Sequence, residues 1–163
     1  GTVVSHLRNS NDFKGAFQRT FKGIREIFFS AYQSYIWNEC VKQLVRQTSN
    51  EVYSVYYEAG KLVFPRGWKP VDAFPLVAPD LSADDKTMKL IDNVLAIEKM
   101  KLSDFSTDEH VFVARLREVC VVPQDLVMEE GNDERSRKQK VVLSFSLPKG
   151  AYATIVTKAL FQQ

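Results

Sequence analysis

The side chains best suited to chemistry lie near the carboxyl terminus, in the run Leu147-Pro148-Lys149-Gly150-Ala151-Tyr152-Ala153-Thr154. Pro148 and Gly150 end an alternating apolar stretch, and a helical pattern follows them. Tyr152 is therefore expected just past a sharp strand-to-helix turn, with Lys149 in the turn beside it. A tyrosine there offers a flat ring and a hydroxyl that can reach a hydrogen-bond acceptor, and the lysine can hold a phosphate. On the pattern alone, the more ordinary interpretation is a ring that plugs a hydrophobic core.

A second group of candidates is basic. Four of them lie in the charged stretch between residues 129 and 140, namely Arg135, Arg137, Lys138 and Lys140. The net charge of +2 is unevenly distributed, with +4 over residues 1–50, −4 over residues 51–110 and +2 over residues 111–163. The two cationic ends could lie against phosphate groups while the acidic middle faces solvent. A mixed, solvated surface is the alternative, and charge alone favours it.

The residue content argues against several other functions. No GxSxG, GxxxxGK[ST] or GxGxxG motif is present. The two cysteines, Cys40 and Cys120, and the two histidines, His6 and His110, lie far apart, so we expect neither a disulfide framework nor a metal site. No apolar run approaches the roughly 20 residues that span a bilayer. The first residues lack a signal-peptide pattern, so a cytoplasmic protein is expected.

Apolar periodicity predicts the elements that position these residues. Residues 24–46 form one long helix, apolar on so much of its surface that we expect it to be buried on most sides. Its polar Gln33 and Asn38 should then be hydrogen-bonded. A second helix is predicted over residues 82–101, opened by Ser82 with capping-box spacing to Asp85. A short helix is expected over residues 12–20, strands over 61–64 and 141–147, an exposed hairpin loop over 129–140, and a final helix over 151–161.

Three segments of this chain carry a family resemblance. The run that contains Tyr152 resembles the "LPxGS(F/Y)AT" strand–turn–helix at the C-terminal end of TruD-type tRNA pseudouridine synthases. Ile27–Asn38, which reads IFFSAYQSYIWN, is similar to the "lSAyQSylfN" helix of that family. Arg117 and Val121–Leu126 are similar to its Arg-led stretch that ends in "PQxL". The three blocks occur in the family's order and cover nearly the whole chain, weakly between residues 50 and 110.

One motif of the family is missing. Its catalytic aspartate lies in a "GxKDxxAxT" loop, well upstream of all three blocks. No aspartate of this chain has that setting. The "GN" and "FGxQRFG" motifs of the family are missing too. Ala16–Arg19 resembles part of "FGxQRFG" but lacks its glycines. The chain therefore resembles the C-terminal half of a pseudouridine synthase without its nucleophile.

The resemblance implies an α+β fold in two parts. Residues 1–120 would form the helix-rich insertion domain of the family. Residues 121–163 would supply a strand–turn–helix portion of its mixed-sheet catalytic domain. The N-terminal half of that catalytic domain, in the same or a separate chain, would be the protein partner.

The resemblance also implies an activity, the isomerisation of a uridine in tRNA to pseudouridine. In the family an aspartate attacks the nucleoside, the glycosidic bond breaks and uracil rejoins through carbon, without metal or organic cofactor. Tyr152 matches the active-site aromatic whose ring covers the flipped base. The candidate RNA-binding residues are Arg117, Lys149, Arg135, Arg137, Lys138 and Lys140. Two alternatives stay open: a non-catalytic RNA-binding or assembly module, as a degenerate paralogue or half of a split enzyme, and an interaction domain that binds no RNA.

Overall fold

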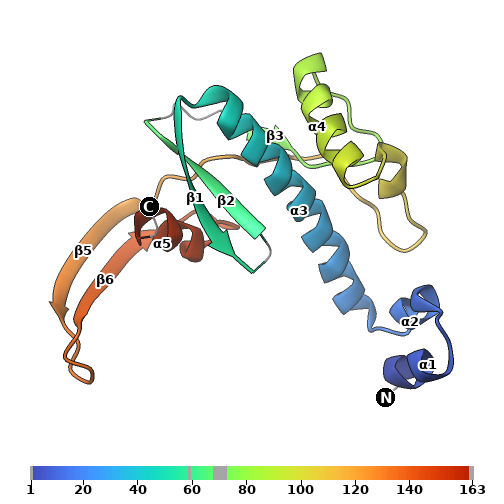
Figure 1. The fold of residues 1–163 in the computed structure, drawn as a ribbon, viewed down its shortest axis with the longest axis horizontal. Coiled ribbons are helices and arrows are strands. Elements are labelled where there is room, and N and C mark those ends of the chain that lie inside the picture. The colour runs from blue at the N-terminus through green and yellow to red at the C-terminus, as the bar shows by residue number, and fades with distance from the viewer. Residues whose placement is uncertain (1, 59, 68–72, 162–163) are drawn as a thin grey trace. The chain divides into compact units, whose positions relative to one another are not determined.

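The structure is a computed structural model that describes residues 2–58, 60–67 and 73–161. It combines helices with two-stranded sheets (Figure 1), which confirms the predicted α+β class. The chain divides into two compact units, one of Gly1–Leu44 with Phe74–Arg117, the other of Val45–Ala73 with Glu118–Gln163. The predicted division into an insertion domain of residues 1–120 and a catalytic portion of residues 121–163 stays a prediction.

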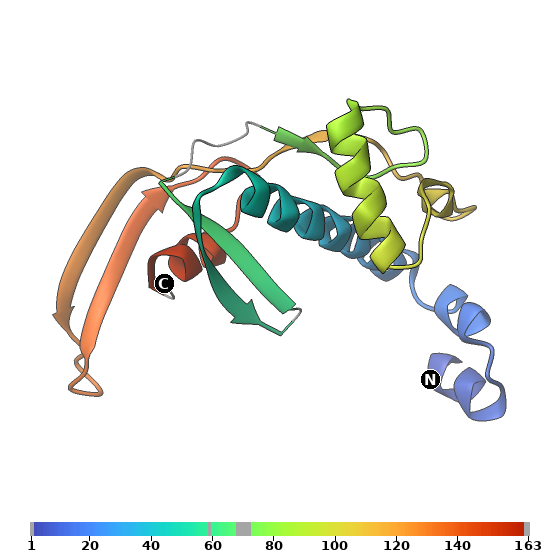
Figure 2. The same cartoon turned by 45° about the horizontal axis from the view of Figure 1, so that its top comes forward.

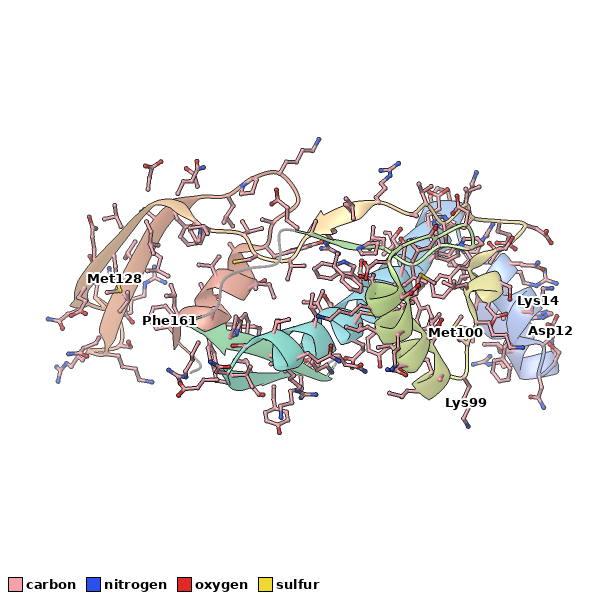
Figure 3. The ribbon with its side chains drawn as sticks, turned by 90° about the horizontal axis from the view of Figure 1, so that it is seen from above. Asp12, Lys14, Lys99, Met100, Met128 and Phe161 are labelled. Carbon is pink, nitrogen blue, oxygen red and sulfur yellow. The ribbon has the colours of Figure 1, made fainter. Side chains whose placement is uncertain are left out.

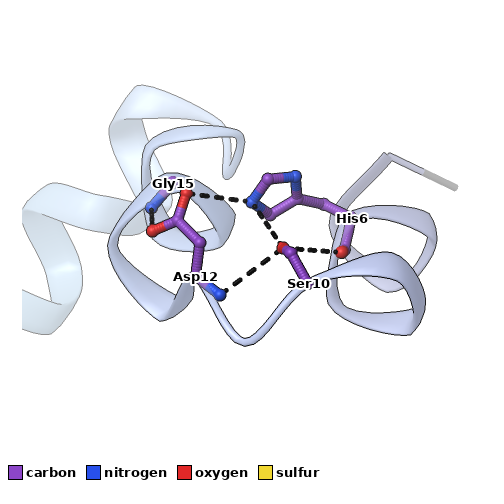
Figure 4. Close-up of polar contacts among 4 residues, drawn as sticks. All are labelled: His6, Ser10, Asp12 and Gly15. Atoms are coloured by element: carbon purple, nitrogen blue, oxygen red, sulfur yellow. Dashed lines mark hydrogen bonds and ion pairs between the residues drawn. The ribbon is translucent and has the colours of Figure 1, made fainter.

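The first unit begins with two short helices, α1 (Thr2–Asn9) and α2 (Phe13–Gln18). Asp12 caps α2, because its carboxylate accepts a hydrogen bond from the Gly15 backbone N–H at 2.8 Å. That bond, with a smaller contribution from His6, lowers the pKa of Asp12. His6 Nε2 lies 3.2 Å from Asp12 Oδ2, and the Ser10 hydroxyl donates to the His6 carbonyl oxygen at 3.0 Å (Figure 4). The cluster fixes the corner between the two helices.

Helix α3 (Lys22–Thr48) is the longest element and includes the whole of the predicted helix over residues 24–46. At its N-terminal end, the Ile24 N–H donates a hydrogen bond to the carbonyl oxygen of Phe21 at 2.9 Å. Arg25 ties this end to the rest of the first unit. Its guanidinium donates to the carbonyl oxygen of Gln18 at 2.8 Å and forms an ion pair with Glu109, also at 2.8 Å.

Helix α4 (Asp85–Ile97) begins later than predicted. Asp84, and not Ser82, caps it, because the Asp84 carboxylate accepts from the backbone N–H groups of Lys86 and Thr87, each at 3.1 Å. The hydroxyl and N–H of Thr87 together hold the pKa of Asp84 below its ordinary value. The helix ends before Lys99, whose φ of 57° lies in the left-handed region. A 3-10 turn, η1 (Leu102–Phe105), follows.

The core of the first unit lies between α3, α4 and the segments that flank them (Figure 2). Near the C-terminal end of α4, the Tyr35 hydroxyl donates to Glu98 Oε1 at 3.0 Å, and the Tyr32 hydroxyl donates to the sulfur of Met100 at 2.9 Å. Lys99 and Met100 follow that helix (Figure 3). Short strands β3 (Ala73–Pro75) and β4 (Leu116–Glu118) pair with each other. The largest fully buried side chains of this unit are Phe105, Ile36, Ile91, Leu95, Val77, Val94 and Cys40.

The prediction that α3 is buried on most sides is correct for its second half and wrong for its first. Ile36 and Cys40 are 0% exposed. In contrast, Ile24, Ile27 and Phe28 are 46%, 66% and 56% exposed. The described residues cover one side of this first half and leave the other side in solvent.

The second unit contains two antiparallel hairpins and a helix. Strands β1 (Glu51–Tyr57) and β2 (Gly60–Arg66) pair in a register that places Val55 opposite Leu62. Strands β5 (Gln124–Asn132) and β6 (Gln139–Ser146) form the longer hairpin, and α5 (Ala153–Phe161) follows. The Tyr53 hydroxyl of β1 donates to the carbonyl oxygen of Ala159 in α5 at 2.8 Å. None of the described helices has the length and apolar composition that a membrane span requires.

Candidate functional site

The corner between β6 and α5 has the strand–turn–helix form that the sequence predicted. The turn closes where the Ala151 N–H donates to the Pro148 carbonyl oxygen at 3.1 Å. Gly150 has a φ of +95°, a conformation that residues with a side chain rarely adopt. The Tyr152 carbonyl oxygen accepts from the Ile155 N–H at 3.0 Å, so Tyr152 stands directly at the start of α5.

Tyr152 does not plug a core formed by the described residues. Its side chain is 62% exposed. A plug would be buried, because the packing that closes a core removes an aromatic ring from water. The ring is therefore free to contact a ligand or a part of the protein outside this chain.

An open groove of about 630 Å³ lies in the second unit, and the residues before this corner form one of its walls. Gln124 and Ser146, which are opposite each other in the β5–β6 pairing, both line it. Gln124 belongs to the "PQxL" block, and Leu147 and Pro148 belong to the "LPxG" block, so the hairpin brings these two blocks together. The other lining residues are Glu118, Cys120, Val121 and Val122. The groove was not predicted, because its existence depends on the strand register.

The basic candidates of the second unit occupy two exposed places. Lys149 lies in the turn before Tyr152. The others lie at or next to the tip of the β5–β6 hairpin, where the Asp133 N–H donates to the Lys138 carbonyl oxygen at 2.8 Å. The predicted hairpin is thus confirmed, although its loop is shorter than residues 129–140. The exposed cations of the tip are Arg135, Arg137 and Lys138, and the exposed Lys140 follows in β6, opposite Gly131.

Arg117 belongs to the first unit and is held differently. Its guanidinium carbon lies 4.8 Å from the centre of the Trp37 ring, a cation–π contact, and Nη1 donates to Ser34 Oγ at 3.4 Å. Both partners lie in the "SAyQSylfN" block of α3. The side chain is half-buried. Arg117 therefore joins two of the motif blocks, a role that the sequence did not reveal.

The remaining polar groups of the α3 block hold the fold together. Gln33 is buried, and its amide donates to the Val77 carbonyl oxygen at 2.8 Å, which confirms the prediction that it is hydrogen-bonded. The indole N–H of Trp37 donates to the Phe74 carbonyl oxygen at 2.9 Å. These bonds satisfy backbone groups of the segment that precedes α4.

The His6–Ser10–Asp12 cluster is not a catalytic triad. The Ser10 hydroxyl and the Asp12 carboxylate approach the same imidazole nitrogen, Nε2, at 3.3 Å and 3.2 Å (Figure 4). A relay needs the nucleophile and the carboxylate on opposite nitrogens. The cluster therefore acts as a structural link between α1 and α2.

Comparison with known proteins decides the family. A family model described as "tRNA pseudouridine synthase D (TruD)" matches residues 2–60 and 71–160. This chain belongs to the TruD family. A Methanocaldococcus jannaschii protein named "Probable tRNA pseudouridine synthase D 2" is 33% identical over 98% of this chain and 41% of its own length. A Methanococcus maripaludis protein named "Probable tRNA pseudouridine synthase D 1" is 34% identical over 98% of this chain and 44% of its own length.

The relationship extends beyond these two. A protein of Aquifex aeolicus named "tRNA pseudouridine synthase D" is 30% identical over 98% of this chain and 43% of its own length. This TruD chain thus spans less than half the length of these relatives. The resemblance seen in three short blocks holds across almost all of its residues.

Proposed function

We propose that this chain is the C-terminal portion of a tRNA pseudouridine synthase, an enzyme that isomerises a uridine in tRNA. The observation that carries the proposal is the exposed Tyr152 ring at the β6–α5 corner, four residues after Pro148, which lines the groove where two family blocks meet. In this proposal the chain supplies RNA-binding surface and the ring on which the target base stacks. No metal or organic cofactor takes part.

The chemistry of the reaction explains why an exposed ring is useful. The target uridine has to leave its stack in the RNA, which costs a few kcal/mol. A base that stacks on an aromatic side chain recovers on the order of 1–3 kcal/mol. Tyr152 can provide that surface because more than half of its side chain is free. The nucleophilic aspartate would come from the segment that carries the family's "GxKD" loop.

The basic residues support a role in RNA binding. Lys149 lies three positions before Tyr152, where a phosphate next to the flipped nucleotide could be held. The hairpin tip and the start of β6 add four exposed cations in a short segment, a suitable surface for the backbone of a tRNA arm. Arg117 contributes through its outer N–H groups, while Trp37 and Ser34 fix the guanidinium plane.

The protein partner in this proposal is the N-terminal half of the catalytic domain, in the same or a separate chain. Strands β5 and β6 and helix α5 contain no buried residue among those described. An isolated two-stranded hairpin is marginally stable in water, and further strands or packing stabilise it. The missing half would provide that packing as well as the nucleophile. We place the complete enzyme in the cytoplasm, with its tRNA substrate.

The exposed cations of the hairpin would also suit one alternative, a non-catalytic RNA-binding or assembly module. Pseudouridine mapping separates the two. The 163-residue chain and a complete synthase, in which the segment with the "GxKD" loop precedes it, are incubated with unmodified tRNA. We expect pseudouridine from the complete protein and none from the chain alone. Turnover by the chain alone would show that its nucleophile lies among these residues, and a complete protein that binds tRNA without turnover would support the alternative.

A further inference from the structure

An apolar row at the start of α3 stays largely exposed and has no part in the proposed site. It consists of Phe21, Ile24, Ile27 and Phe28, and we call it the α3 apolar row. We propose that this row is a docking surface for the N-terminal half of the catalytic domain that this chain lacks. The inference rests on the proposed function and names where on the first unit that partner binds.

The members of the row form one continuous surface. Ile24, Ile27 and Phe28 have the i, i+3, i+4 spacing that places side chains on one side of a helix. A Cβ atom added to Gly23 would lie 3.2 Å from the Phe21 ring, so that ring folds back over the first turn of α3 and extends the row. The exposed fractions are 77% for Phe21, 46% for Ile24, 66% for Ile27 and 56% for Phe28.

The first unit already uses another side of the same helical segment. Phe29 contacts the rings of Phe17, His110 and Phe112, with centroid distances of 5.5, 5.2 and 5.8 Å. Phe28 of the row also contacts the Phe17 ring, with centroids 6.2 Å apart, yet it stays 56% exposed. A helix side that faces solvent usually carries charged residues, whereas this row carries none. Contiguous exposed apolar surface of this kind marks an interaction site.

The length of the relatives identifies the occupant. They match 98% of this chain with only 41% and 44% of their own residues, so more than half of the family's length is a further body of protein. In this proposal, that body packs against the part described here. The sequence pattern of α3 predicts burial on most sides, and the described residues leave the α3 apolar row uncovered. The missing half accounts for both observations.

RNA fits this row less well than protein does. Only two of its four members, Phe21 and Phe28, have a ring on which a base could stack. Arg25, the cation next to Ile24 in the sequence, is engaged in an ion pair with Glu109 at 2.8 Å, whereas Lys22 is 74% exposed and lies 4.0 Å from Glu26. Phosphate binding depends on cations that are free to replace counterions. The chemistry of the row therefore points to an apolar protein surface.

The test compares one substitution in two contexts. Ile27→Glu is made in the 163-residue chain and in the complete synthase, together with a matched control, Ile97→Glu. Ile97 lies in α4 of the same unit and is 71% exposed, close to the 66% of Ile27. Glutamate is a good helix former, so propensity is preserved at both sites. Melting temperature, oligomeric state and tRNA affinity are measured for each protein.

We expect both substitutions to leave the chain alone unchanged within about 2 °C, because both sites face solvent there. In the complete synthase, Ile27→Glu should lower the melting temperature by more than about 5 °C, since it buries a charge in an apolar interface, while Ile97→Glu should not. Equal behaviour of Ile27→Glu in both contexts would overturn the proposal. Loss of tRNA affinity in the chain alone would assign the row to RNA, and dissociation of a dimer by Ile27→Glu would assign it to a second copy.

The outcome is separable from that of the proposed function. A complete protein that makes no pseudouridine, yet is destabilised by Ile27→Glu alone, would reject the proposed activity and retain the docking surface. A fully active synthase that tolerates Ile27→Glu would retain the proposed activity and reject the docking surface.

Discussion

The first unit and the C-terminal hairpin–helix segment differ in how deeply their apolar residues are buried. The first unit encloses a core, with Phe105, Ile91 and Ile36 at 1% exposure or less, although the α3 apolar row stays exposed. The segment made of β5, β6 and α5 leaves its apolar residues open, with Met128 at 58% and Phe161 at 55% exposure (Figure 3). Both sequences are apolar enough to form a core. The first unit therefore carries its own core, and in the proposed function the C-terminal segment contributes to a core that the N-terminal half of the catalytic domain completes.

Single substitutions should show this difference most strongly in stability. Phe105→Ala opens a cavity in the first unit and should lower the free energy of unfolding by about 3–5 kcal/mol. Val142→Ala, at a β6 position that is 42% exposed, should lower it by less than about 1 kcal/mol in the chain alone. Urea titrations of both variants provide the values. A larger loss for Val142→Ala than for Phe105→Ala would show that the hairpin, and not the first unit, carries the core.

The reactivity of the two cysteines tests the same difference in burial without a substitution. Cys40 is buried in the first unit and Cys120 is exposed beside the groove. Burial, assisted by Glu39, raises the pKa of Cys40 from 9.0 to about 12. At pH 8 its thiolate fraction is then about a thousandfold below that of an ordinary thiol, so thiol reagents should modify Cys120 alone. Mass spectrometry of the labelled native chain checks this. Equal labelling of Cys40 would show that the first unit opens readily.

Sequence reasoning succeeded where local patterns decide the outcome. Helix α3 and the corner at Tyr152 follow from apolar periodicity and from Pro148 and Gly150. It failed where the tertiary environment decides. The cap of α4 moved from Ser82 to Asp84, whose carboxylate serves two N–H groups at once. Helix α1 and strand β1 were not predicted, because a short element owes its stability mainly to its neighbours.

The candidate site shows the same limit. Tyr152, Lys149 and the cations of the hairpin could be named from the sequence, because motifs and charges are local. The groove could not, since it depends on the pairing of Gln124 with Ser146 across a register shift in the hairpin. The contact of Arg117 with Trp37 joins residues 80 positions apart in sequence, and no pattern within either segment predicts it.

RNA binding should also distinguish the two regions, with a smaller effect. If Lys138 and Lys149 contact phosphates, the affinity for tRNA falls steeply with salt, each contact adding about 0.7–0.9 to the log–log slope. Lys138→Gln and Lys149→Gln should each reduce that slope by about this amount. Lys89→Gln, at an exposed α4 position of the first unit, is the matched control and should leave the slope unchanged. A slope that is the same in all three variants would remove the C-terminal cations from the RNA interface.

The most direct test of the account concerns Tyr152 in the complete synthase. Single-turnover rates of pseudouridine formation are measured beside melting curves for Tyr152→Ala and Tyr152→Phe. Loss of stacking in Tyr152→Ala should remove on the order of 1–3 kcal/mol, roughly a 5- to 150-fold lower rate, with tRNA affinity and melting temperature little changed. Tyr152→Phe retains the ring and should keep most of the activity. A well-folded Tyr152→Ala enzyme with the wild-type rate would contradict the account and remove Tyr152 from the active site.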